Sequence, residues 1–410
     1  MLSSYPSWII ALGIVFLVAW LIQLTLLLTV WMRMMRQSRR QAQQPAADSA
    51  FRPGVSVLVY SRNEADALAR NLPVLLSQDY PDYEVIVLDD NSVDETADVL
   101  TMMDQRFDHL IHTRIDNRAR AMSHRKLGVL LGVKAAHHDI LLMTHAECMP
   151  TSAEWISGMV AQLADPKVEV VLGPAVYERR ASMLSQFCQF DLFNRLLLLF
   201  GITLAVRPFA GWGQNLAFRK STFYAHGSQG FQRHLNIQPG EDDLFVADVT
   251  NGHNVAAECR PTSVVVDQSK PLFVAWSIER LNRGFTSRLY AWLPALVRGM
   301  DGVTRYLTVL PGIALVAYTL YSIISGGDVP GADASHVSEW IALGTVMVLL
   351  LVRMGLMAYA HHASARALRL RPQTVWPVLL DLYMPLVDVW FRCKALMRRK
   401  RFGVGHIGLL

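Results

Sequence analysis

The chain has 410 residues and a net charge of +5, from 39 lysines and arginines against 34 aspartates and glutamates. Hydrophobic residues make up 52% of it and charged residues only 18%, a balance that excludes a disordered chain. The four cysteines show no CxxC spacing, which excludes a zinc ribbon and a disulfide scaffold. The basic residues gather beside apolar runs, so a membrane surface is the expected partner and nucleic acid is not.

Residues 1–32 are predicted to form an N-terminal transmembrane anchor. No charged residue lies between Trp8 and Met32, and an apolar helix of about 25 residues crosses a hydrocarbon core of about 30 Å. A basic cluster follows at once, and the positive-inside rule therefore places this end of the anchor in the cytoplasm. Residues 33–54, which contain that cluster, are expected to be a basic linker.

Residues 55–270 have the pattern of an α/β domain. Short β-rich runs, among them VSVLVYS, YEVIVLDD, DILLMTH and VEVVLG, alternate with helical stretches. This alternation predicts a mainly parallel sheet that is covered by helices. Polar residues gather at the ends of these runs, where open α/β sheets bind their ligands.

Two further transmembrane helices are predicted within residues 304–362, after interface helices in residues 271–303. One candidate runs from Tyr306 to Gly327 and the other from Trp340 to Ala360, where Arg353 is expected near the inner interface with its side chain reaching toward water. The loop between them carries acidic residues but no lysine or arginine, and basic segments follow. This predicts a multi-pass protein of a bacterial-type inner membrane, with the N-terminus outside and the α/β domain and C-terminus in the cytoplasm.

Two segments are expected at the membrane surface. Residues 363–410 are predicted to form an interfacial amphipathic helix and a basic tail, because Asp381 and Asp388 share one helical face and would be costly in lipid. The apolar stretch from Leu196 to Val206 is too short to span a membrane. An interfacial helix is the favoured interpretation of this stretch, and a buried core helix is the alternative.

Seven segments of the chain, taken in order, resemble the motifs of membrane-bound family 2 glycosyltransferases. They are SRNEADAL, VLDDNSVDET, HRKLGVLLG, MTHAECMP, GWGQNLAFRKSTF, GEDDLF and WSIERLNRGFTS. Each motif is weak by itself, but their order and spacing together are specific, and they cover most of the chain. The resemblance implies a GT-A domain, which is a Rossmann-like fold that binds nucleotide sugars, and a sugar transfer that inverts the anomeric centre.

The resemblance implies that the first two segments bind the nucleotide of the donor. Ser61, Asn63 and Glu64 would border the base and ribose, although the same residues also suit a helix N-cap and first turn. Asp89 and Asp90 would recognise uracil or ribose, with Asp90 the stronger candidate. The alternative for these two aspartates is a turn that their side chains build.

Three more donor contacts are implied by later segments. Lys126 would approach the diphosphate or the base, and a solvated helix lysine is the alternative. Asn215 would contact the transferred sugar. Arg283 would help to close the site over the diphosphate, but the glutamine and the aromatic residue of the family's element are missing here, so Arg280 or Glu279 would have to stand in. Both arginines would otherwise face lipid phosphates.

The fourth segment departs from the family's pattern. Family members usually have an Asp-x-Asp-like element there, whose carboxylates hold a manganese or magnesium ion, whereas this chain has His145 and Glu147. Side chains at positions i and i+2 of an extended segment point the same way, so both would still reach one ion. An imidazole ligand favours manganese over magnesium. The alternative is a lost metal role, with His145 a polar residue at a strand end.

GEDDLF supplies the expected general base. An inverting transfer needs a carboxylate on the acceptor side that takes the proton of the attacking hydroxyl. By the resemblance, Asp242 is this base and Glu241 stands beside it, while Asp243 lies beyond the motif. The acidic run would also suit the N-terminus of a helix, and the two roles are compatible.

These residues favour an inverting hexosyltransferase of the membrane that uses a nucleotide-diphosphate sugar, with uridine diphosphate the expected carrier. Three membrane-spanning helices are few for a channel that would export a polysaccharide, which favours a single transfer to a membrane lipid or lipid-linked acceptor over processive synthesis and secretion. A protein partner would have to supply any channel. The alternative is a catalytically impaired relative that acts as a membrane scaffold or partner subunit, because HAE and ERLNR depart from the family's motifs.

Overall fold

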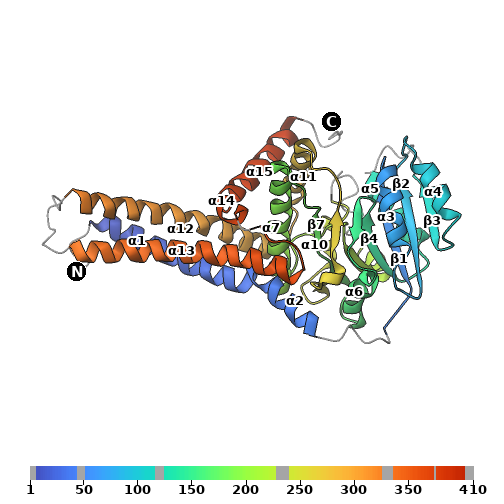
Figure 1. Ribbon diagram of the computed structural model, residues 1–410, viewed down its shortest axis with the longest axis horizontal. Helices are drawn as coiled ribbons and strands as arrows, with labels where there is room; N and C mark the ends of the chain where they lie inside the picture. The colour runs from blue at the N-terminus through green and yellow to red at the C-terminus, as the bar shows by residue number, and fades with distance from the viewer. Residues whose placement is uncertain are drawn as a thin grey trace.

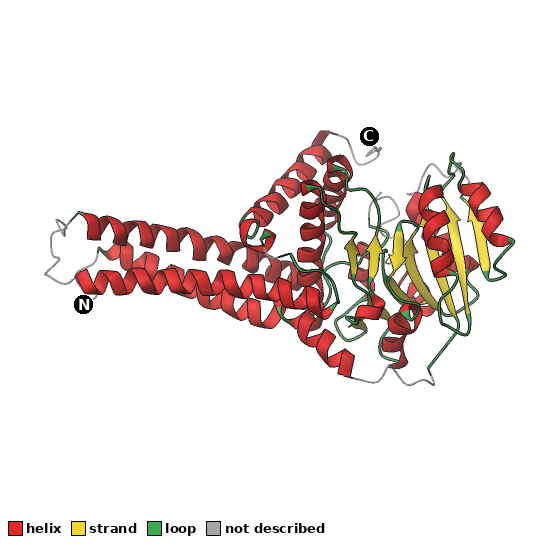
Figure 2. Ribbon diagram, viewed as in Figure 1, coloured by secondary structure: helices red, strands yellow, loops and turns green. Residues whose placement is uncertain are grey.

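The computed structural model describes residues 6–43, 51–115, 124–227, 240–325, 336–373 and 375–401. A helical stalk and an α/β domain make up the molecule, and the two meet at a cluster of shorter helices (Figure 1). Within the described residues, strands occur in the α/β domain alone (Figure 2). Part of the predicted linker (44–50), the loop between the last two predicted spans (326–335) and the end of the predicted basic tail (402–410) lie outside the described residues.

A seven-stranded sheet with the order β3-β2-β1-β4-β8-β6-β9 forms the centre of the domain. Its strands are β1 (Val55–Ser61), β2 (Tyr83–Asp89), β3 (Leu110–Arg114), β4 (Ile140–His145), β6 (Val170–Leu172), β8 (Leu216–Arg219) and β9 (Val255–Ala257). The first four are parallel to their neighbours, and β8 is antiparallel to β4 and β6. Ser61 pairs with Asp89 and Tyr60 with His145, so the polar strand ends share one edge of the sheet.

Successive side chains of each central strand enter two different cores, one on either face of the sheet. Val57 and Val59 pack with α3 (Ala65–Leu75), α4 (Thr96–Asp104) and α6 (Trp155–Ala161), and Leu58 packs on the other face with α5 (His124–Ala135) and α7 (Met183–Ala205). Because both faces are covered, the strands are continuous apolar runs. The predicted α/β class with a mainly parallel sheet is confirmed.

A second sheet has three strands in the order β5-β10-β7. They are β5 (Cys148–Pro150), β7 (Ala175–Tyr177) and β10 (Val265–Asp267), and the short helices α8 (Lys220–Gly227) and α10 (Asp243–Val249) and the 3-10 turns η3 (Gln162–Ala164) and η4 (Pro261–Ser263) complete the domain. Asp267 pairs with Cys148 across β10 and β5. This pairing brings the acid at the end of β10 next to Glu147.

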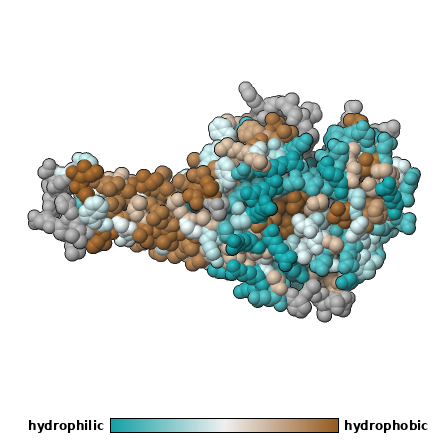
Figure 3. Space-filling model, viewed as in Figure 1, coloured by the Kyte–Doolittle hydropathy of each residue, from teal (hydrophilic) through white to brown (hydrophobic). Residues whose placement is uncertain are grey.

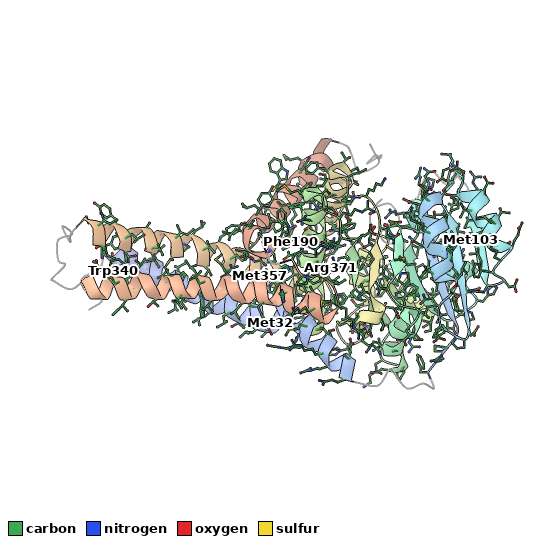
Figure 4. All side chains as sticks on the ribbon, viewed as in Figure 1. Met32, Met103, Phe190, Trp340, Met357 and Arg371 are labelled. Carbon is green, nitrogen blue, oxygen red and sulfur yellow. The ribbon has the colours of Figure 1, made fainter. Side chains whose placement is uncertain are left out.

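The stalk consists of three long helical segments. They are α1 (Ser7–Leu26) with the π-helical turn η2 (Leu27–Trp31), α12 (Trp292–Ile324) and α13 (His336–Ala367). Their outer surface is apolar (Figure 3), and Trp340 lies at the far end of the stalk while Met32 and Met357 lie at its base (Figure 4). By length and composition, these three segments and α7 are able to cross a membrane.

The first part of the predicted basic linker is a helix, which corrects that prediction. α2 (Arg33–Gln43) follows η2 directly, and Met34, Met35 and Ser38 on it are buried. The side-chain amide of Gln41 donates to the carbonyl of Ala257 at 3.0 Å and accepts from the backbone N–H of Cys259 at 2.8 Å. These long-range bonds dock α2 on the edge of the sheet, so the anchor and the domain are rigidly joined here.

The stretch from Leu196 to Val206 belongs to the buried helix α7, so the interfacial interpretation is wrong and the alternative of a core helix holds. Leu196, Leu199 and Phe200 are fully buried. Gly201 lies against η2 so closely that a Cβ on it would come within 2.3 Å of the carbonyl oxygen of Val30. Only glycine permits this approach. α7 therefore packs between the stalk and the sheet.

A buried network of charged side chains closes the base of the stalk. Arg353 is 3% exposed and its guanidinium lies 2.5 Å from a carboxylate oxygen of Asp381, which is also bound by Arg305 at 2.8 Å. Arg305 further pairs with Asp301, and Arg353 donates to the side-chain oxygen of Gln23. The side chain of Arg353 therefore does not reach toward water, and Asp381 does not lie on an exposed interfacial face. The structure corrects both predictions, because each of these charges is paired with an opposite charge inside the protein.

Three more helices surround the junction of stalk and domain. They are α11 (Phe273–Thr286), α14 (Trp376–Leu379) and α15 (Tyr383–Arg401). The predicted interface region 271–303 contains α11 and also the first turns of α12, which starts at Trp292. Helix α12 can begin this far before the apolar run at Tyr306 because Asp301 and Arg305 are neutralised by the buried network.

Candidate active site

Asp90 follows β2 and is held by three neighbours at the edge of the sheet. The hydroxyl of Tyr60 donates to its Oδ2, a guanidinium nitrogen of Arg62 lies 3.3 Å from the same oxygen, and Nδ1 of His124 lies 2.9 Å from Oδ1. Burial and the adjacent carboxylate raise the pKa of Tyr60, so its proton stays available to Asp90. The carboxylate is fixed where the predicted ribose contact would lie, and that contact stays a prediction.

Asp89 and Asn63 build the loops around Asp90. Oδ1 of Asp89 accepts from the backbone N–H of Ser92 at 3.0 Å, which is the turn role that was the alternative. Asn63 adopts φ of 54°, its N–H donates to the Ser92 hydroxyl at 2.8 Å, and its side-chain oxygen accepts from Val93 at 2.9 Å. These bonds occupy both side chains. The Ser61 hydroxyl is buried and has no hydrogen-bond partner among the described residues.

His145 ends β4 and faces Glu147. Nδ1 of His145 lies 3.6 Å from Oε1 of Glu147, and the two side chains are 17% and 23% exposed. Burial alone would lower the pKa of His145, but the carboxylate of Glu147 outweighs it and raises that pKa. Burial alone would raise the pKa of the Glu147 carboxyl, but the imidazole of His145 outweighs it and lowers that pKa below the usual range. The two predicted ligands do lie together, but a turn at Ala146 and Glu147 brings them there and not the alternation of an extended segment, because β4 ends at His145.

Two further carboxylates stand near Glu147. Burial, followed by the charges of Glu147 and Asp267, raises the pKa of Glu64 to about 7, and burial and Glu147 raise the pKa of Asp267 to about 6. Glu64 begins α3 without a side-chain capping bond, so its carboxylate is not used as a helix cap. Sequence reasoning missed Asp267, although the run VVVD ends in an acid as YEVIVLD does.

The residues at this site fit the divalent ion that the resemblance implies, but the protein would supply only two of its ligands. Within the described residues no group of three or more His, Cys, Asp and Glu side chains meets in a metal-binding arrangement. His145 and Glu147 would therefore be the protein's two ligands, and the oxygens of a bound diphosphate would complete the coordination, as is usual for ions that bridge a protein and a phosphate.

Asp242 caps helix α10 and faces the same point as His145. Its Oδ1 accepts from the N–H of Asp243 at 2.7 Å, and its Oδ2 accepts from the N–H of Gly213 at 2.5 Å. A Cβ on Gly213 would lie 3.2 Å from Nε2 of His145 and 3.6 Å from Oδ2 of Asp242. The predicted metal ligand and the predicted base therefore flank one glycine, and a side chain at this position would crowd the imidazole of His145.

The charges around Asp242 tune its proton affinity. Burial and, after it, the neighbouring charges of Glu241 and Asp243 together raise the pKa of Asp242 to about 6. Arg125 pairs with Glu241 at 3.2 Å. A carboxyl with a pKa near 6 is ionised at neutral pH and is a stronger base than an ordinary aspartate, which suits general-base catalysis.

Lys126 is completely buried, which excludes the solvated helix lysine. Burial lowers its pKa to about 8, while the nearby charges of Glu241, Asp243 and Asp242 oppose that fall. The lysine therefore stands beside the acidic run of α10. Asp243 itself is bound by the hydroxyls of Thr286 at 2.6 Å and Tyr290 at 2.5 Å. These two hydroxyls, which the motifs did not indicate, tie the acidic run to the end of α11.

The structure corrects the prediction for Asn215. This side chain is fully buried, its amide donates to the carbonyls of Pro174 at 2.9 Å and Ser263 at 2.8 Å, and its oxygen accepts from the indole of Trp155 at 3.1 Å. No polar atom is left for a sugar. Asn215 instead joins four segments of the domain, because a buried amide needs all of its partners inside the protein.

The structure also separates Arg283 from the acidic cluster. Arg283 forms an ion pair with Glu279 one turn earlier on α11, and in the described part of the chain it has no other ion pair. Arg280, the alternative, is bound by Asp191 on α7 and Asp388 on α15. Neither arginine contacts the residues around Asp242, so the predicted closure over the diphosphate has no support from this geometry.

The sequence of the chain is similar to that of known glycosyltransferases. The family described as glycosyl transferase family 2 matches residues 56–222. A glycosyltransferase of Haloferax volcanii, AglE, is 28% identical over 123 residues, which are 30% of this chain and 39% of that relative's length. The chain thus spans well under half of the curated relative that it matches.

A solved structure shares the fold over most of the chain. The mannosyltransferase PcManGT of Pyrobaculum calidifontis, solved in complex with GDP-Man and Mn²⁺, is similar with a TM-score of 0.51 and 18% identity. The match covers 93% of this chain and 99% of that one. The predicted GT-A domain with flanking helices is therefore confirmed as a fold.

Proposed function

Because residues 56–222 of the chain belong to glycosyl transferase family 2, we propose that the protein transfers a sugar from a nucleotide-diphosphate donor to an acceptor at a membrane. The observation that carries this proposal is the convergence of His145 and Asp242 on Gly213. A transferase needs a site for the leaving diphosphate and a base for the acceptor on either side of one reacting carbon. These two side chains, which are far apart in sequence, would supply both from either side of Gly213.

The proposed reaction is a single displacement with inversion. The acceptor hydroxyl oxygen attacks the anomeric carbon while Asp242 takes the hydroxyl proton, so the new C–O bond forms as the bond to the diphosphate breaks and the nucleoside diphosphate leaves. Two backbone N–H groups hold the carboxylate of Asp242 in place. The pKa of about 6 keeps it ready to accept a proton at neutral pH.

The donor is proposed to lie along the polar edge of the sheet, from Asp90 to Glu147. A divalent ion, when bound there, supplies positive charge that stabilises the departing diphosphate. His145 and Glu147 would hold it, and Lys126 is proposed to add a second positive charge near the leaving group. Manganese is the expected metal because one ligand is an imidazole. The solved mannosyltransferase was crystallised with Mn²⁺ as well.

The carrier nucleotide is proposed to be uridine diphosphate, on the resemblance of the DDNS segment. The similar mannosyltransferase has GDP-Man bound, so a guanosine carrier is the comparison to be made in any test.

We further propose that the stalk crosses a bacterial-type inner membrane, with the α/β domain in the cytoplasm. Four helices of the described chain are long and apolar enough to span, and the arginines of α2 follow the first of them. This arrangement holds the active site close to the membrane surface, which suits a lipid or lipid-linked acceptor.

The test is sugar transfer by the purified full-length protein. UDP- and GDP-linked sugars carrying a radiolabel are incubated with manganese and a membrane lipid extract, and label in the lipid fraction is counted. Asp242→Asn is expected to lower turnover by about 100-fold or more with little change in donor affinity, whereas Asp104→Asn, an exposed acid at the end of α4, should keep full activity. Label that appears equally with Asp242→Asn would overturn the assigned base, and no transfer from any donor would favour the scaffold instead.

A further inference from the structure

A cavity rich in arginine lies where the stalk meets the domain. It is enclosed by α7, α11, α12 and α15, and five arginines line it, against two aspartates: Arg195, Arg280, Arg283, Arg298 and Arg392. Nothing in the catalytic arrangement around Asp242 uses this cavity directly. Its composition is unusual, because buried arginines are normally matched by an equal number of acids.

The two aspartates of the cavity are already occupied. Both Asp191 and Asp388 bind Arg280, and Asp191 also accepts from the indole of Trp276 at 2.8 Å. Arg283 is paired with Glu279. The acids nearby therefore form ion pairs with two of the five arginines, Arg280 and Arg283.

The other three arginines form no ion pair with a described acid, and the charge of Asp388 acts on them only from a greater distance. Arg298 and Arg392 form no ion pair or hydrogen bond with any described residue, and Arg298 lies over the ring of Phe209 at 4.5 Å. One guanidinium nitrogen of Arg195 is buried and lacks an acceptor among the described side chains and backbone groups. A buried donor without an acceptor is costly, so an anion that enters the cavity would gain several charge-assisted hydrogen bonds.

Exposed apolar side chains stand on three of the four helices that enclose the cavity. They include Phe273 and Val274 on α11, Trp292 and Leu296 on α12, and Leu386 and Trp390 on α15. Exposed apolar side chains on short helices at the base of an apolar stalk are typical of helices that lie in the membrane interface. A ligand with an anionic head and a hydrocarbon chain would match both the cavity and these helices.

The cavity also adjoins the proposed base. Tyr290 lines it and donates to Asp243 at 2.5 Å, and the N–H of Asp243 donates to Asp242. From the other side, Arg195 lies over the ring of Trp212 at 5.3 Å, directly before Gly213. A group held by the arginines would therefore sit on the acceptor side of Asp242.

We propose that this cavity binds the phosphate or diphosphate group of a lipid acceptor, and that Arg195, Arg298 and Arg392 are its ligands. The proposal rests on the proposed function, since it names the chemical class of the acceptor. The head group would be held by the three guanidinium groups and the chain would run along the exposed apolar side chains into the bilayer. Because the arginines hold the phosphate, the attacking hydroxyl would belong to the group that is linked to that phosphate, such as a sugar. Asp242 would take the proton of this hydroxyl as the nucleoside diphosphate leaves.

The experiment measures binding to the full-length protein in phosphatidylcholine nanodiscs. The probes are farnesyl phosphate, farnesol, inorganic phosphate and pyrophosphate. Farnesyl phosphate is expected to bind at least about tenfold more tightly than farnesol and than either inorganic anion. Equal binding of farnesol would overturn recognition of the phosphate, and equal binding of an inorganic anion would show that the site takes free phosphate and not a lipid.

Variants then locate the site. Arg298→Gln and Arg392→Gln are each expected to weaken farnesyl phosphate binding by about tenfold or more, and Arg298→Lys by less, because it keeps the charge but loses the forked donor geometry. The matched control is Arg39→Gln, an exposed arginine of α2 near the same membrane surface, which should bind normally. A loss of the same size in Arg39→Gln would mean that general surface charge is responsible and would overturn the proposal.

The same variants separate this inference from the proposed function. Donor affinity, measured with UDP- and GDP-sugars, should be unchanged in Arg298→Gln and Arg392→Gln, while KM for a phosphorylated lipid acceptor rises. If the wild type transfers sugar but these variants keep their KM, the cavity is not the acceptor site although the function stands. If the wild type binds farnesyl phosphate and transfers nothing, the cavity stands and the proposed function fails.

Discussion

A methyl group added at Gly213 is expected to slow the reaction without unfolding the protein. The alanine Cβ would lie 3.2 Å from Nε2 of His145, 3.5 Å from Cε of Met143 and 3.6 Å from Oδ2 of Asp242. Only the first distance is shorter than ordinary contact, so the imidazole would have to move by about a few tenths of an ångström. The φ of Gly213 is not positive, so alanine fits the backbone.

The size of the effect follows from this displacement. A misplacement of about 1 Å in a reacting group costs about 100-fold in rate, so a few tenths of an ångström predict a loss of about 3- to 10-fold in kcat. Replacing glycine by alanine also restricts the unfolded chain and stabilises the fold by about 0.4–1 kcal/mol. This gain roughly offsets the tight contact, so Tm should change by less than about 3 °C.

Transfer rate and thermal unfolding of the purified Gly213→Ala protein are the measurements. The control is Gly344→Ala on α13, where no atom lies within 4 Å of the added Cβ. It should keep its transfer rate and unfold at the same or a slightly higher temperature, because no tight contact offsets the gain from the restricted unfolded chain. Gly213→Val, with two more methyl groups in the same space, should lose far more activity than Gly213→Ala. Unchanged kcat in both Gly213 variants would refute the convergence of His145 and Asp242 on one reacting position.

Three further outcomes are expected. First, kcat should fall as the pH drops through about 6. Below this raised pKa Asp242 is protonated and cannot act as a base, and above it the carboxylate is ionised. A rate that is constant between pH 5 and 7 would exclude Asp242 as the base. Second, chelation should abolish transfer, and His145→Asp should remain active and accept magnesium better than the wild type does; transfer that is indifferent to chelator would remove His145 as a ligand. Third, Asp381→Asn should lower the free energy of unfolding in detergent by about 3 kcal/mol, since Arg305 and Arg353 lose their shared carboxylate, while Asp104→Asn should not.

Much of the molecule follows from local sequence because its signals lie within single short windows. A β-rich run that ends in polar residues predicts a strand and its loop, and the strands β1, β2 and β4 lie where the sequence places them. The long uncharged segments likewise predict the stalk. The functional motifs were found for the same reason, since His145 and Glu147, or Glu241 and Asp242, are neighbours in the chain and are brought together by one strand end or one helix cap.

Other features were decided only by contacts between distant segments. Arg353 and Asp381 each look like an isolated charge in an apolar stretch, and only the packing of α13 against α14 shows that each neutralises the other. Asn215 has the sequence context of a ligand contact, yet the carbonyls of Pro174 and Ser263 occupy it. Asp267 joins Glu147 through the pairing of β10 with β5.

The physical reason for this division is the range of the interactions concerned. Helix and strand periodicity, capping and apolar character depend on residues a few positions apart, so the sequence by itself determined the α/β domain, the long apolar helices and the acidic motifs. The burial of a polar group depends on whether a partner arrives from elsewhere in the chain. Only the tertiary structure could therefore decide that Asn215 is a structural amide, that Arg280 is already paired, and that Arg298 and Arg392 have no ion pair within the described residues, beside the proposed active site.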